Sequence, residues 1–455
     1  MKTSILSLII NIVWGINLFA QNSSMYDNPE IKNNLDSYVN SYTKTGDFSG
    51  CIAINKGDSN IYQECFGYAN QSFKVLNEKN TKFKIGSVSK QFTAAAILIM
   101  EQEELLKTTD TLSNFFSNNS NAERITIQQL LTHTSGITDI YNVPNFNKLS
   151  CQKKTISELS NLVLDSELEF EPGTQYQYSN GGYAILAELV EKLSGIAYQD
   201  YLNKKIFQPL NMKATGHNKS NDVIPNLAVG YDPSGYNDVK ITDFLDPELL
   251  KGSGSLYSTV QDLRVWINSI KNKSLLSKSS YEKLLTDYGH NYGFGVSVYK
   301  SFDKDVFGHD GRVNGYIADY LHYKESDISV IILGNLQTGV ADFFRRDIAA
   351  IVFNKKYANR AKTIPPEKNV YPDNEKILGI YSFGPNFKVY IEEIEGSIQA
   401  RANEGGYSEL VLLEDKRFFS RTLYSYIEFK EDDKGRTVKM VWTNNDGNSF
   451  EGIKE

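Results

Sequence analysis

The chain has 455 residues, of which 40% are hydrophobic and 23% charged, with a formal net charge of -7. This composition is typical of a soluble globular protein of two or three domains. Because no basic run or basic helix face accompanies the acidic balance, the sequence offers nothing to bind a phosphate backbone, and nucleic acid is not expected as a partner.

The chain begins with a pattern typical of exported proteins. Residues 1–20, MKTSILSLIINIVWGINLFA, carry one lysine, then an apolar stretch, and end in Ala20 before the polar QNSS. This predicts a signal peptide that is removed on export to the periplasm or the cell exterior. The alternative is an uncleaved anchor, although the apolar core is shorter than the roughly 18 residues of a spanning helix. No later segment is long and apolar enough to span a bilayer, so no membrane span is expected in the mature chain.

Two of the three cysteines lie in a predicted hairpin at 49–70. Cys51 and Cys65 are nearly equidistant from a turn at Gly57 and Asp58. An oxidising compartment would allow a cross-strand disulfide between them, and two buried free thiols are the alternative. The cysteines are too few for a disulfide framework, and their spacing does not fit a zinc site.

The predicted elements of the first domain run from helix to strand. Residues 26–48 are predicted to be helical, and from Thr81 to about Lys273 the patterns are again mostly helical. Strands then return in YGFGVSVYK, FGHDGRVNGYIADYLHYK and ISVIILGN, before a last helix, ADFFRRDIAAIVF. Strands on both sides of a helical region predict an α+β domain at 26–356, in which the first and last strands pair in one antiparallel sheet flanked by helices.

The remainder of the chain differs in pattern. Residues 357–374 form a polar stretch with prolines, which is typical of a linker. From 375 to 455, short strand patterns such as KVYIEEI, SELVLLE, SYIEFKE and TVKMVWT alternate with turns. This predicts a small all-β, barrel-like domain.

One serine and one lysine stand out as candidates for catalysis. Ser87 follows a turn at Gly86 and opens a strongly apolar helix, and Lys90 lies three residues later, on the same helix face. The helix N-terminus favours a developing alkoxide and a neutral amine, and a neutral lysine can accept the serine proton. The alternative is that Ser87 only caps the helix while Lys90 points into water.

Two further polar groups lie downstream. Tyr178 and Asn180 precede a helix with two glycines at its entrance; a tyrosine beside a lysine can relay a proton, and an amide can orient the lysine and the substrate. His309, Asp310 and Gly311 lie on a predicted strand, where the glycine lets a substrate backbone approach.

With these groups in this order, the chain resembles the serine β-lactamase and penicillin-binding-protein superfamily. It is most similar to the class C β-lactamase-related hydrolases, which include D-alanyl-D-alanine carboxypeptidases, D-aminopeptidases and esterases. The resemblance covers about 26–354 and includes the longer phrases LLTHTSGI, EPGTQYQYSNGGY and GSGSLYSTVQDLRVW. It implies a β-lactamase/transpeptidase-like fold. It also implies that Ser87 is the acylated nucleophile, Lys90 its activating amine, Tyr178 the acid/base partner and Asn180 a supporting residue.

The same resemblance places the remaining parts of the site. His309, Asp310 and Gly311 stand where relatives carry a Lys-Thr-Gly or His-x-Gly triad, and the backbone N–H groups of Ser87 and Arg312 would form the oxyanion hole. His133, in the LLTHTSGI phrase, is expected to be structural. The five histidines lack metal-ligand spacing, and a serine acyl-enzyme needs no cofactor, so neither a metal nor a cofactor is expected.

Asp310 departs from the family pattern. In relatives that bind penicillins or D-Ala-D-Ala this position usually bears a hydroxyl that holds the substrate carboxylate, which an aspartate would repel. Arg312 would compensate for it, or Asp310 would point away into the structure. If Asp310 faces the cleft, esters, amides or substrates with a free amine are favoured.

The sequence therefore predicts an exported serine hydrolase that acts through an acyl-enzyme on a small ester, amide or peptide, including peptides with D-amino acids. A noncatalytic member that binds cell-wall peptide or a protein is the alternative, and a weak β-lactamase or D,D-carboxypeptidase is the third reading. The C-terminal domain resembles the lipocalin-like domains attached to this family, and it is expected to cover the cleft or to bind a partner. Substrate identity and oligomeric state do not follow from the sequence.

Overall fold

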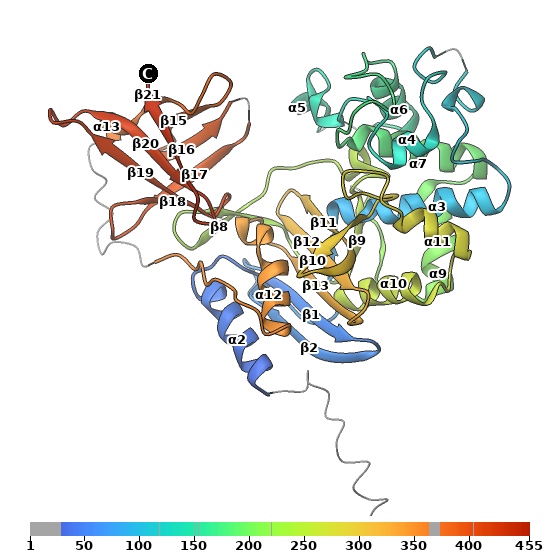
Figure 1. Cartoon of the computed structure of the whole chain (residues 1–455), viewed down its shortest axis with the longest axis horizontal. Coiled ribbons are helices and arrows are strands. Elements are labelled where there is room, and N and C mark those ends of the chain that lie inside the picture. The colour runs from blue at the N-terminus through green and yellow to red at the C-terminus, as the bar shows by residue number, and fades with distance from the viewer. Residues whose placement is uncertain are drawn as a thin grey trace, which may run out of the picture.

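The computed structural model describes residues 29–117, 119–150, 152, 154–219, 221–363, 374–403 and 405–455. The predicted signal peptide lies outside the described residues, as do residues 364–373 of the predicted linker. Among the described residues, none of the helices has the length and apolar character that crossing a bilayer requires. Figure 1 shows a central sheet with helices around it and a separate barrel at the C-terminal end.

The centre of the first domain is a six-stranded sheet in the order β10-β11-β12-β13-β1-β2. Strand β1 pairs with β13 in antiparallel register from Gly50↔Gly334 to Lys56↔Ile328. The prediction that the first and last strands meet in one antiparallel sheet is therefore confirmed. The strands span Gly50–Lys56 (β1), Ser59–Phe66 (β2), Ser297–Ser301 (β10), Lys304–Val313 (β11), Tyr316–Tyr323 (β12) and Ile328–Gly334 (β13).

Helices cover both faces of this sheet, which explains why all seven residues of β13 are buried. Because successive side chains of a strand point to opposite faces, Ile331 and Leu333 join one core cluster while Val330 and Ile332 join another. The second cluster includes helices α2 (Pro29–Lys44) and α12 (Phe344–Val352), which pack side by side (Figure 1). The first includes α3 (Lys90–Gln102), α10 (Val260–Asn272) and α11 (Lys278–Leu285).

The inserted helical region lies on the α3 side of the sheet. Capping boxes begin two of its helices, at Thr126 and Thr155, and satisfy backbone donors that would otherwise be unpaired. The helices of this region are α4 (Ile127–Leu131), α5 (Phe146–Leu149), α6 (Ile156–Leu164), α7 (Asn180–Ser194), α8 (Tyr198–Leu202) and α9 (Gln208–Leu210). The first domain also contains short strands: β3 (Tyr68–Asn70), β4 (Val75–Leu76), β5 (Phe83–Lys84), β6 (Gly216–His217), β7 (Tyr231–Ser234), β8 (Asp238–Ile241) and β9 (Leu256–Ser258).

Two strand predictions need correction. The pattern YGFGVSVYK becomes a strand only from Ser297, because Gly295 has a φ of +70° and packs against the start of α3, where an added Cβ would lie 2.8 Å from the Lys90 carbonyl oxygen. The long pattern from Phe307 to Lys324 divides into β11 and β12 at a turn in which Gly315 has a φ of +78°. The positive φ of these two glycines is incompatible with extended strand, so β10 begins after Gly295 and the chain turns between β11 and β12 at Gly315.

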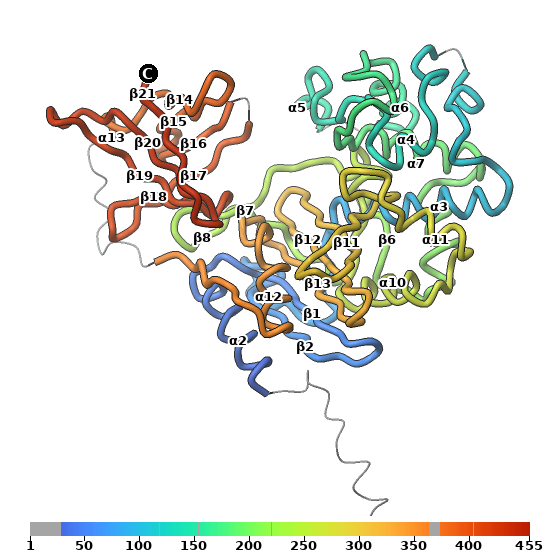
Figure 2. Tube along the Cα trace, viewed as in Figure 1, coloured from blue at the N-terminus to red at the C-terminus, as the bar shows by residue number. Residues whose placement is uncertain are grey.

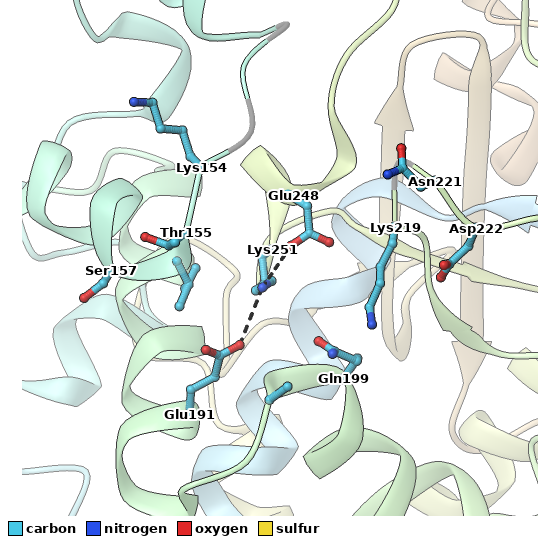
Figure 3. A pocket seen from close by; sticks show the side chains of 12 residues that line it. Lys154, Thr155, Ser157, Glu191, Gln199, Lys219, Asn221, Asp222, Glu248 and Lys251 are labelled. Atoms are coloured by element: carbon cyan, nitrogen blue, oxygen red, sulfur yellow. Dashed lines mark ion pairs between the residues drawn. The ribbon is translucent and has the colours of Figure 1, made fainter.

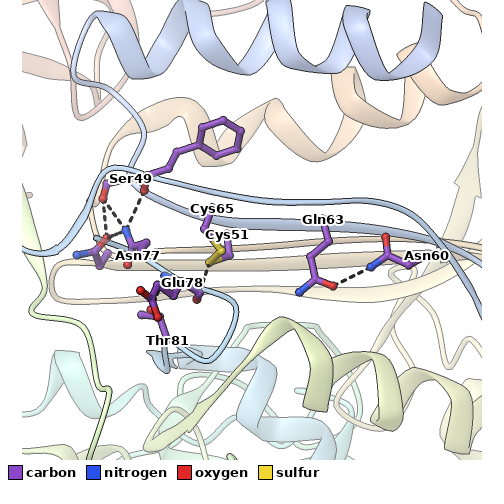
Figure 4. The surroundings of a disulfide bond; sticks show 10 residues. Ser49, Cys51, Asn60, Gln63, Cys65, Asn77, Glu78 and Thr81 are labelled. Atoms are coloured by element: carbon purple, nitrogen blue, oxygen red, sulfur yellow. Dashed lines mark hydrogen bonds between the residues drawn. A yellow bond between two sulfur atoms is a disulfide. The ribbon is translucent and has the colours of Figure 1, made fainter. Parts of the chain in front are cut away.

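Cys51 and Cys65 lie directly opposite each other on β1 and β2, and their sulfur atoms are bonded at 2.12 Å. Figure 4 shows the bond beside a hydrogen-bonded group at the start of β1, in which the Asn77 amide donates to Ser49 Oγ at 3.0 Å. Ser49 in turn donates to Asn335 Oδ1 at 2.8 Å. The disulfide and these side chains together connect β1 to the segments on both sides of it.

The C-terminal domain is a closed barrel of eight strands, which confirms the prediction of a small barrel-like all-β domain. Closure pairs the first strand with the last and leaves no open sheet edge. A short helix, α13 (Asn374–Ile377), precedes the barrel. Its strands are β14 (Gly379–Ser382), β15 (Lys388–Ile394), β16 (Ser397–Ala402), β17 (Tyr407–Leu412), β18 (Phe418–Ser420), β19 (Ser425–Glu431), β20 (Thr437–Thr443) and β21 (Ser449–Lys454).

A buried carboxylate joins the barrel to the first domain. Asp47 is fully buried and accepts from Arg421 Nε at 2.8 Å, from Lys362 Nζ at 2.6 Å and from the Tyr424 hydroxyl at 3.1 Å. Arg421 also donates to carbonyl oxygens of the β7–β8 hairpin, which lies beside the barrel in Figure 2. Two cations around one buried carboxylate compensate for its loss of hydration.

Candidate active site

Ser87 lies on a 3-10 turn (η1, Gly86–Ser89) directly before α3, and its side chain is half-buried. The turn needs glycine, since Gly86 has a φ of +48° and an added Cβ would lie 2.8 Å from Arg312 N. A Cβ on Gly311 would lie 3.0 Å from Ser87 N. These two glycines let β11 approach the turn closely, so the backbone N–H groups of Ser87 and Arg312 are close together, as an oxyanion hole requires.

Lys90 has no exposed surface, so the alternative in which it points into water is wrong. Its Nζ lies 3.2 Å from Ser87 Oγ, 2.7 Å from Asn180 Oδ1 and 2.9 Å from the Ser253 carbonyl oxygen. Burial lowers the pKa of Lys90 to about 7, although the carboxylates of Asp139 and Asp310 oppose this.

These contacts predict where the lone pair of a neutral Lys90 amine points. A neutral amine has two N–H groups and one lone pair. Asn180 Oδ1 and the Ser253 carbonyl oxygen can only accept hydrogen bonds, so they take both N–H groups. The lone pair is left facing the hydroxyl of Ser87, which is the arrangement that removes a proton from a serine nucleophile.

Asp139 orients Asn180 and was missed by the sequence reasoning. Its Oδ2 accepts from Asn180 N at 3.0 Å and from Asn180 Nδ2 at 2.9 Å, so the amide oxygen must face Lys90. Gly181 permits this approach, because a Cβ there would lie 2.5 Å from the Thr138 carbonyl oxygen. The available signal was an aspartate two residues after LLTHTSGI. The Ser253 carbonyl, in GSGS, was also missed, and a backbone acceptor leaves no signal in residue type.

Tyr178 lies against Lys90, with its ring centroid 4.6 Å from Nζ. Burial raises the pKa of Tyr178 well above its ordinary value, which the neighbouring Ser87 hydroxyl offsets only in part. Its own buried hydroxyl makes no hydrogen bond of good geometry to any described residue. A phenol with a raised pKa stays protonated at neutral pH, so the state of Tyr178 suits a proton donor or relay better than a base.

A chain of hydrogen bonds runs behind Tyr178 and determines the tautomers of two histidines. His133 Nδ1 accepts from the backbone N–H of Ser179 at 3.1 Å, so its proton is on Nε2, which lies 3.3 Å from the Tyr292 hydroxyl. The Tyr292 hydroxyl lies 2.9 Å from His309 Nε2 and donates to it, which leaves the His309 proton on Nδ1, facing the Asp310 carbonyl. Burial lowers the pKa of His309 to about 4 and that of His133 well below its ordinary value, so both rings are neutral. The contacts of His133 are those of a residue that positions its neighbours, and Tyr292 was not identified from the sequence.

Asp310 faces the site instead of pointing into the structure. Its side chain is exposed and lines a pocket of about 570 Å³ together with Ser87. Burial alone would raise its pKa, but the Arg345 and Arg312 guanidinium groups and a backbone hydrogen bond help to hold the pKa below its ordinary value. The Arg312 guanidinium forms an ion pair with Asp342 and so does not pair with Asp310. The pocket therefore presents the Asp310 carboxylate, and Arg312, which pairs with Asp342, lines it as well.

Most of the other residues that line the pocket are aromatic. Tyr176, Tyr178, Tyr292 and Tyr299 line it together with His290, whose ring stacks on Tyr176 at 4.7 Å. No described residue of the barrel lines it, so the expectation that the barrel covers the cleft is not met. Among the described residues, no cluster of three or more His, Cys, Asp or Glu side chains could hold a metal ion.

A second pocket of similar size, about 580 Å³, offers no comparable chemistry (Figure 3). Three of its charged side chains pair with each other: Lys251 Nζ lies 2.9 Å from Glu248 and 3.5 Å from Glu191. Behind it, His217 bridges Ser255 and Glu248 at 2.8 Å each, in the order of a hydroxyl, imidazole and carboxylate triad. Ser255 is only 3% exposed and does not line the pocket, so no substrate reaches it.

Comparison with known proteins identifies the family of the chain. The family model described as Beta-lactamase matches residues 35–354. "Penicillin-binding protein 4*" of Bacillus subtilis is 27% identical over 444 residues, which cover 90% of this chain and 95% of that protein.

Two solved structures share the fold. The octameric penicillin-binding protein homologue from Pyrococcus abyssi has a TM-score of 0.63 at 23% identity and covers 93% of this chain and 99% of its own. The D-amino acid amidase from Ochrobactrum anthropi SV3, complexed with D-phenylalanine, has a TM-score of 0.62 at 19% identity and covers 71% of this chain and 98% of its own. With the family match over most of its length and this shared fold, the chain belongs to the beta-lactamase family, whose members are serine hydrolases such as amidases and penicillin-binding proteins.

Proposed function

We propose that this protein is a Ser-x-x-Lys hydrolase in which Ser87 forms an acyl-enzyme. The observation that carries the proposal is the buried Lys90 amine, whose pKa is about 7 and whose lone pair faces Ser87 Oγ at 3.2 Å. Burying an amine so deeply lowers its affinity for a proton, which serves catalysis. A noncatalytic binding protein, the alternative reading, would gain nothing from it.

The reaction follows from these contacts. Ser87 Oγ attacks the carbonyl carbon of the substrate while its proton passes to Lys90, and the negative oxygen is stabilised by the N–H groups of Ser87 and Arg312. The tetrahedral intermediate then collapses and expels an amine or alcohol, which takes the proton from Lys90 through the Tyr178 hydroxyl. Water attacks the carbonyl carbon of the acyl-enzyme and gives a proton to Lys90. The second tetrahedral intermediate then collapses, the bond from this carbon to Ser87 Oγ breaks, and Lys90 returns the proton to Ser87 Oγ, which releases the carboxylic acid product.

The substrate we propose is an amide, ester or peptide that carries a free amine close to the scissile bond. Asp310 supports this, since a carboxylate in the pocket attracts an ammonium group and repels the carboxylate of a penicillin or of D-Ala-D-Ala. The tyrosine rings suit an aromatic or apolar side chain, and cation–π contact adds to the attraction for an amine. The D-amino acid amidase neighbour makes D-configured substrates the first to test.

The first test is intact-mass spectrometry after reaction with a fluorophosphonate. We expect one adduct on the full chain and none on Ser87→Ala; a folded protein that gives no adduct would favour the noncatalytic reading. D-phenylalanine amide is then compared with its N-acetyl derivative, and we expect the free amine to be cleaved faster. A parallel sample with penicillin tests the third reading, since a lasting or rapidly hydrolysed penicillin adduct would indicate a penicillin-binding protein or β-lactamase.

We also propose that the protein is exported to the periplasm or the cell exterior. The leader pattern at 1–20 and the bond between Cys51 and Cys65 support this, because disulfides persist in oxidising compartments. Expression of the full sequence in a bacterium, followed by fractionation and intact mass, tests it. Export predicts a shortened protein outside the cytoplasm that lacks the leader.

A further inference from the structure

A smaller cavity of about 190 Å³ adjoins the active-site pocket, because Asp310 and Arg312 line both of them. Its other lining residues belong to β11, β12, α12 and the short 3-10 turn η6 (Gly339–Asp342) that precedes α12. Three carboxylates and two guanidinium groups meet in it: Asp310, Asp319, Asp342, Arg312 and Arg345. The way in which these groups pair decides which charge is left to act on a substrate.

Two ion pairs use up both guanidinium groups. Arg345 donates from Nη1 to Oδ1 of the buried Asp319 at 2.6 Å. Arg312 donates from Nη2 to Oδ1 of Asp342. Neither arginine forms an ion pair with Asp310 in the described part of the chain. The carboxylate that remains is also the one of the three that lines the active-site pocket.

Arg312 could act on a substrate if Asp342 did not hold it. Its side chain lines the active-site pocket and is 39% exposed, and that of Asp342 is 41% exposed, so solvent reaches the pair and packing does not lock it. Asp310 lies two positions before Arg312 on the same strand, hence on the same face. Without the charge of Asp342, the guanidinium group would turn to Asp310 or to a substrate carboxylate.

The turn that carries Asp342 is held from two sides. Val340 and Phe343 are buried in the same core cluster as α2 and α12. The first residue of the turn, Gly339, donates its backbone N–H to the Arg421 carbonyl oxygen of the barrel at 2.9 Å. The barrel therefore helps to place Asp342, although no described barrel residue lines the active-site pocket.

We propose that Asp342 is a positioning residue that determines specificity: by holding Arg312, it leaves Asp310 to select positively charged substrates over negatively charged ones. This inference rests on the proposed function. An ammonium group meets a carboxylate that no guanidinium neutralises, whereas a substrate carboxylate meets the same charge and an arginine that already has a partner. Removing the charge of Asp342 should relax the preference without altering any side chain that lines the active-site pocket.

The test uses three fluorophosphonates with the same alkyl chain, which ends in a trimethylammonium, a hydroxyl or a carboxylate group. The rate of adduct formation on Ser87 of the full chain is measured by intact mass at pH 7. The ratio of the ammonium rate to the carboxylate rate reports the charge preference, because effects on the chemical step cancel in it. We expect a ratio above one, which falls at least fivefold in Asp342→Asn, the effect of one exposed ion pair at its upper value.

The outcomes separate this inference from the proposed function. No adduct with any of the three probes would overturn the proposed function, and this inference with it. Adducts that form with an unchanged ratio in Asp342→Asn would overturn only the role of Asp342. The thermal transition and the rate with the hydroxyl probe show that the variant is folded.

Two controls test whether Asp342 acts through Arg312. Asp446→Asn removes a similarly exposed carboxylate, which pairs with Arg346 at 2.9 Å and lines neither cavity, so the ratio should change less than twofold. In an Arg312→Gln background, adding Asp342→Asn should have little effect on the ratio. The same fall with and without Arg312 would mean that the charge of Asp342 acts directly on the probe, and would refute the positioning role.

Discussion

Replacing Asp139 with asparagine tests the claim that Lys90 is the base. Asparagine has nearly the same shape and still offers an oxygen to the amide of Asn180, so the substitution mainly removes a negative charge. That charge raises the pKa of Lys90, in opposition to burial. Without it the charged amine is less stable, the pKa of Lys90 falls below about 7, and the neutral amine becomes available at lower pH.

The size of the shift follows from the contacts. Asp139 binds the Asn180 amide whose oxygen contacts Lys90 Nζ, so the two charges are separated by one amide group, about 7 Å. At an effective dielectric constant of about 20, the interaction is about 2 kcal/mol, which corresponds to roughly one to two pH units.

The assay is the rate of fluorophosphonate adduct formation on Ser87, measured by intact mass across the pH range in which the protein stays folded. The unmodified chain should reach its half-maximal rate near pH 7, where Lys90 loses its proton, and Asp139→Asn should reach it at lower pH. Asp415→Asn is the matched control, because Asp415 lies on the barrel, where it pairs with Arg417. An unchanged midpoint in Asp139→Asn, or a shift to higher pH, would refute the assignment of Lys90 as the base.

Three further predictions concern Tyr292, Asp310 and Arg421. Tyr292→Phe removes the hydroxyl that joins His133 and His309 but keeps the ring. Because it disturbs the positioning of these side chains and not substrate binding, kcat should fall about tenfold with little change in KM. A change confined to KM would contradict this. Asp310→Ser should lower kcat/KM for amine-bearing substrates about tenfold and speed the formation of penicillin adducts. If the variant keeps the same preference for free over N-acetylated substrates, the contact between Asp310 and the substrate ammonium group is refuted. Arg421→Met leaves the buried Asp47 short of a partner and should lower the free energy of unfolding by about 3–5 kcal/mol in denaturant titration, whereas Arg417→Met, at an exposed ion pair, should cost about 1 kcal/mol or less. Equal effects of the two arginine variants would mean that the Asp47 group does not hold the barrel in place.

Local patterns determined much of the fold. Strands β15, β19 and β20 begin and end at the residues of the patterns KVYIEEI, SYIEFKE and TVKMVWT, because alternation of inward and outward side chains is a property of neighbouring residues. The prediction for 292–300 was less accurate, since Gly295 turns the chain to fit the backbone of Lys90, which is distant in sequence.

In the candidate site, too, some residues could be identified from neighbouring residues and others only from contacts between distant ones. Ser87 and Lys90 are three positions apart, which suffices to place both on one turn of helix, so the sequence could identify that pair. Asp139 and Tyr292 could be identified only in the structure. Each acts through a hydrogen bond to a residue distant in sequence: Asp139 to Asn180, 41 residues away, and Tyr292 to His309, 17 residues away.

Burial and docking were decided only by the tertiary structure. The pKa of Lys90 falls because the surrounding elements exclude water from it, and no local pattern records that exclusion. The barrel is held against the first domain by a contact between Arg421 and Asp47, which are 374 residues apart. The sequence by itself determined the elements and the chemical groups of this protein, because these depend on neighbouring residues. The tertiary structure decided which groups lose their water, because solvation depends on everything packed around them.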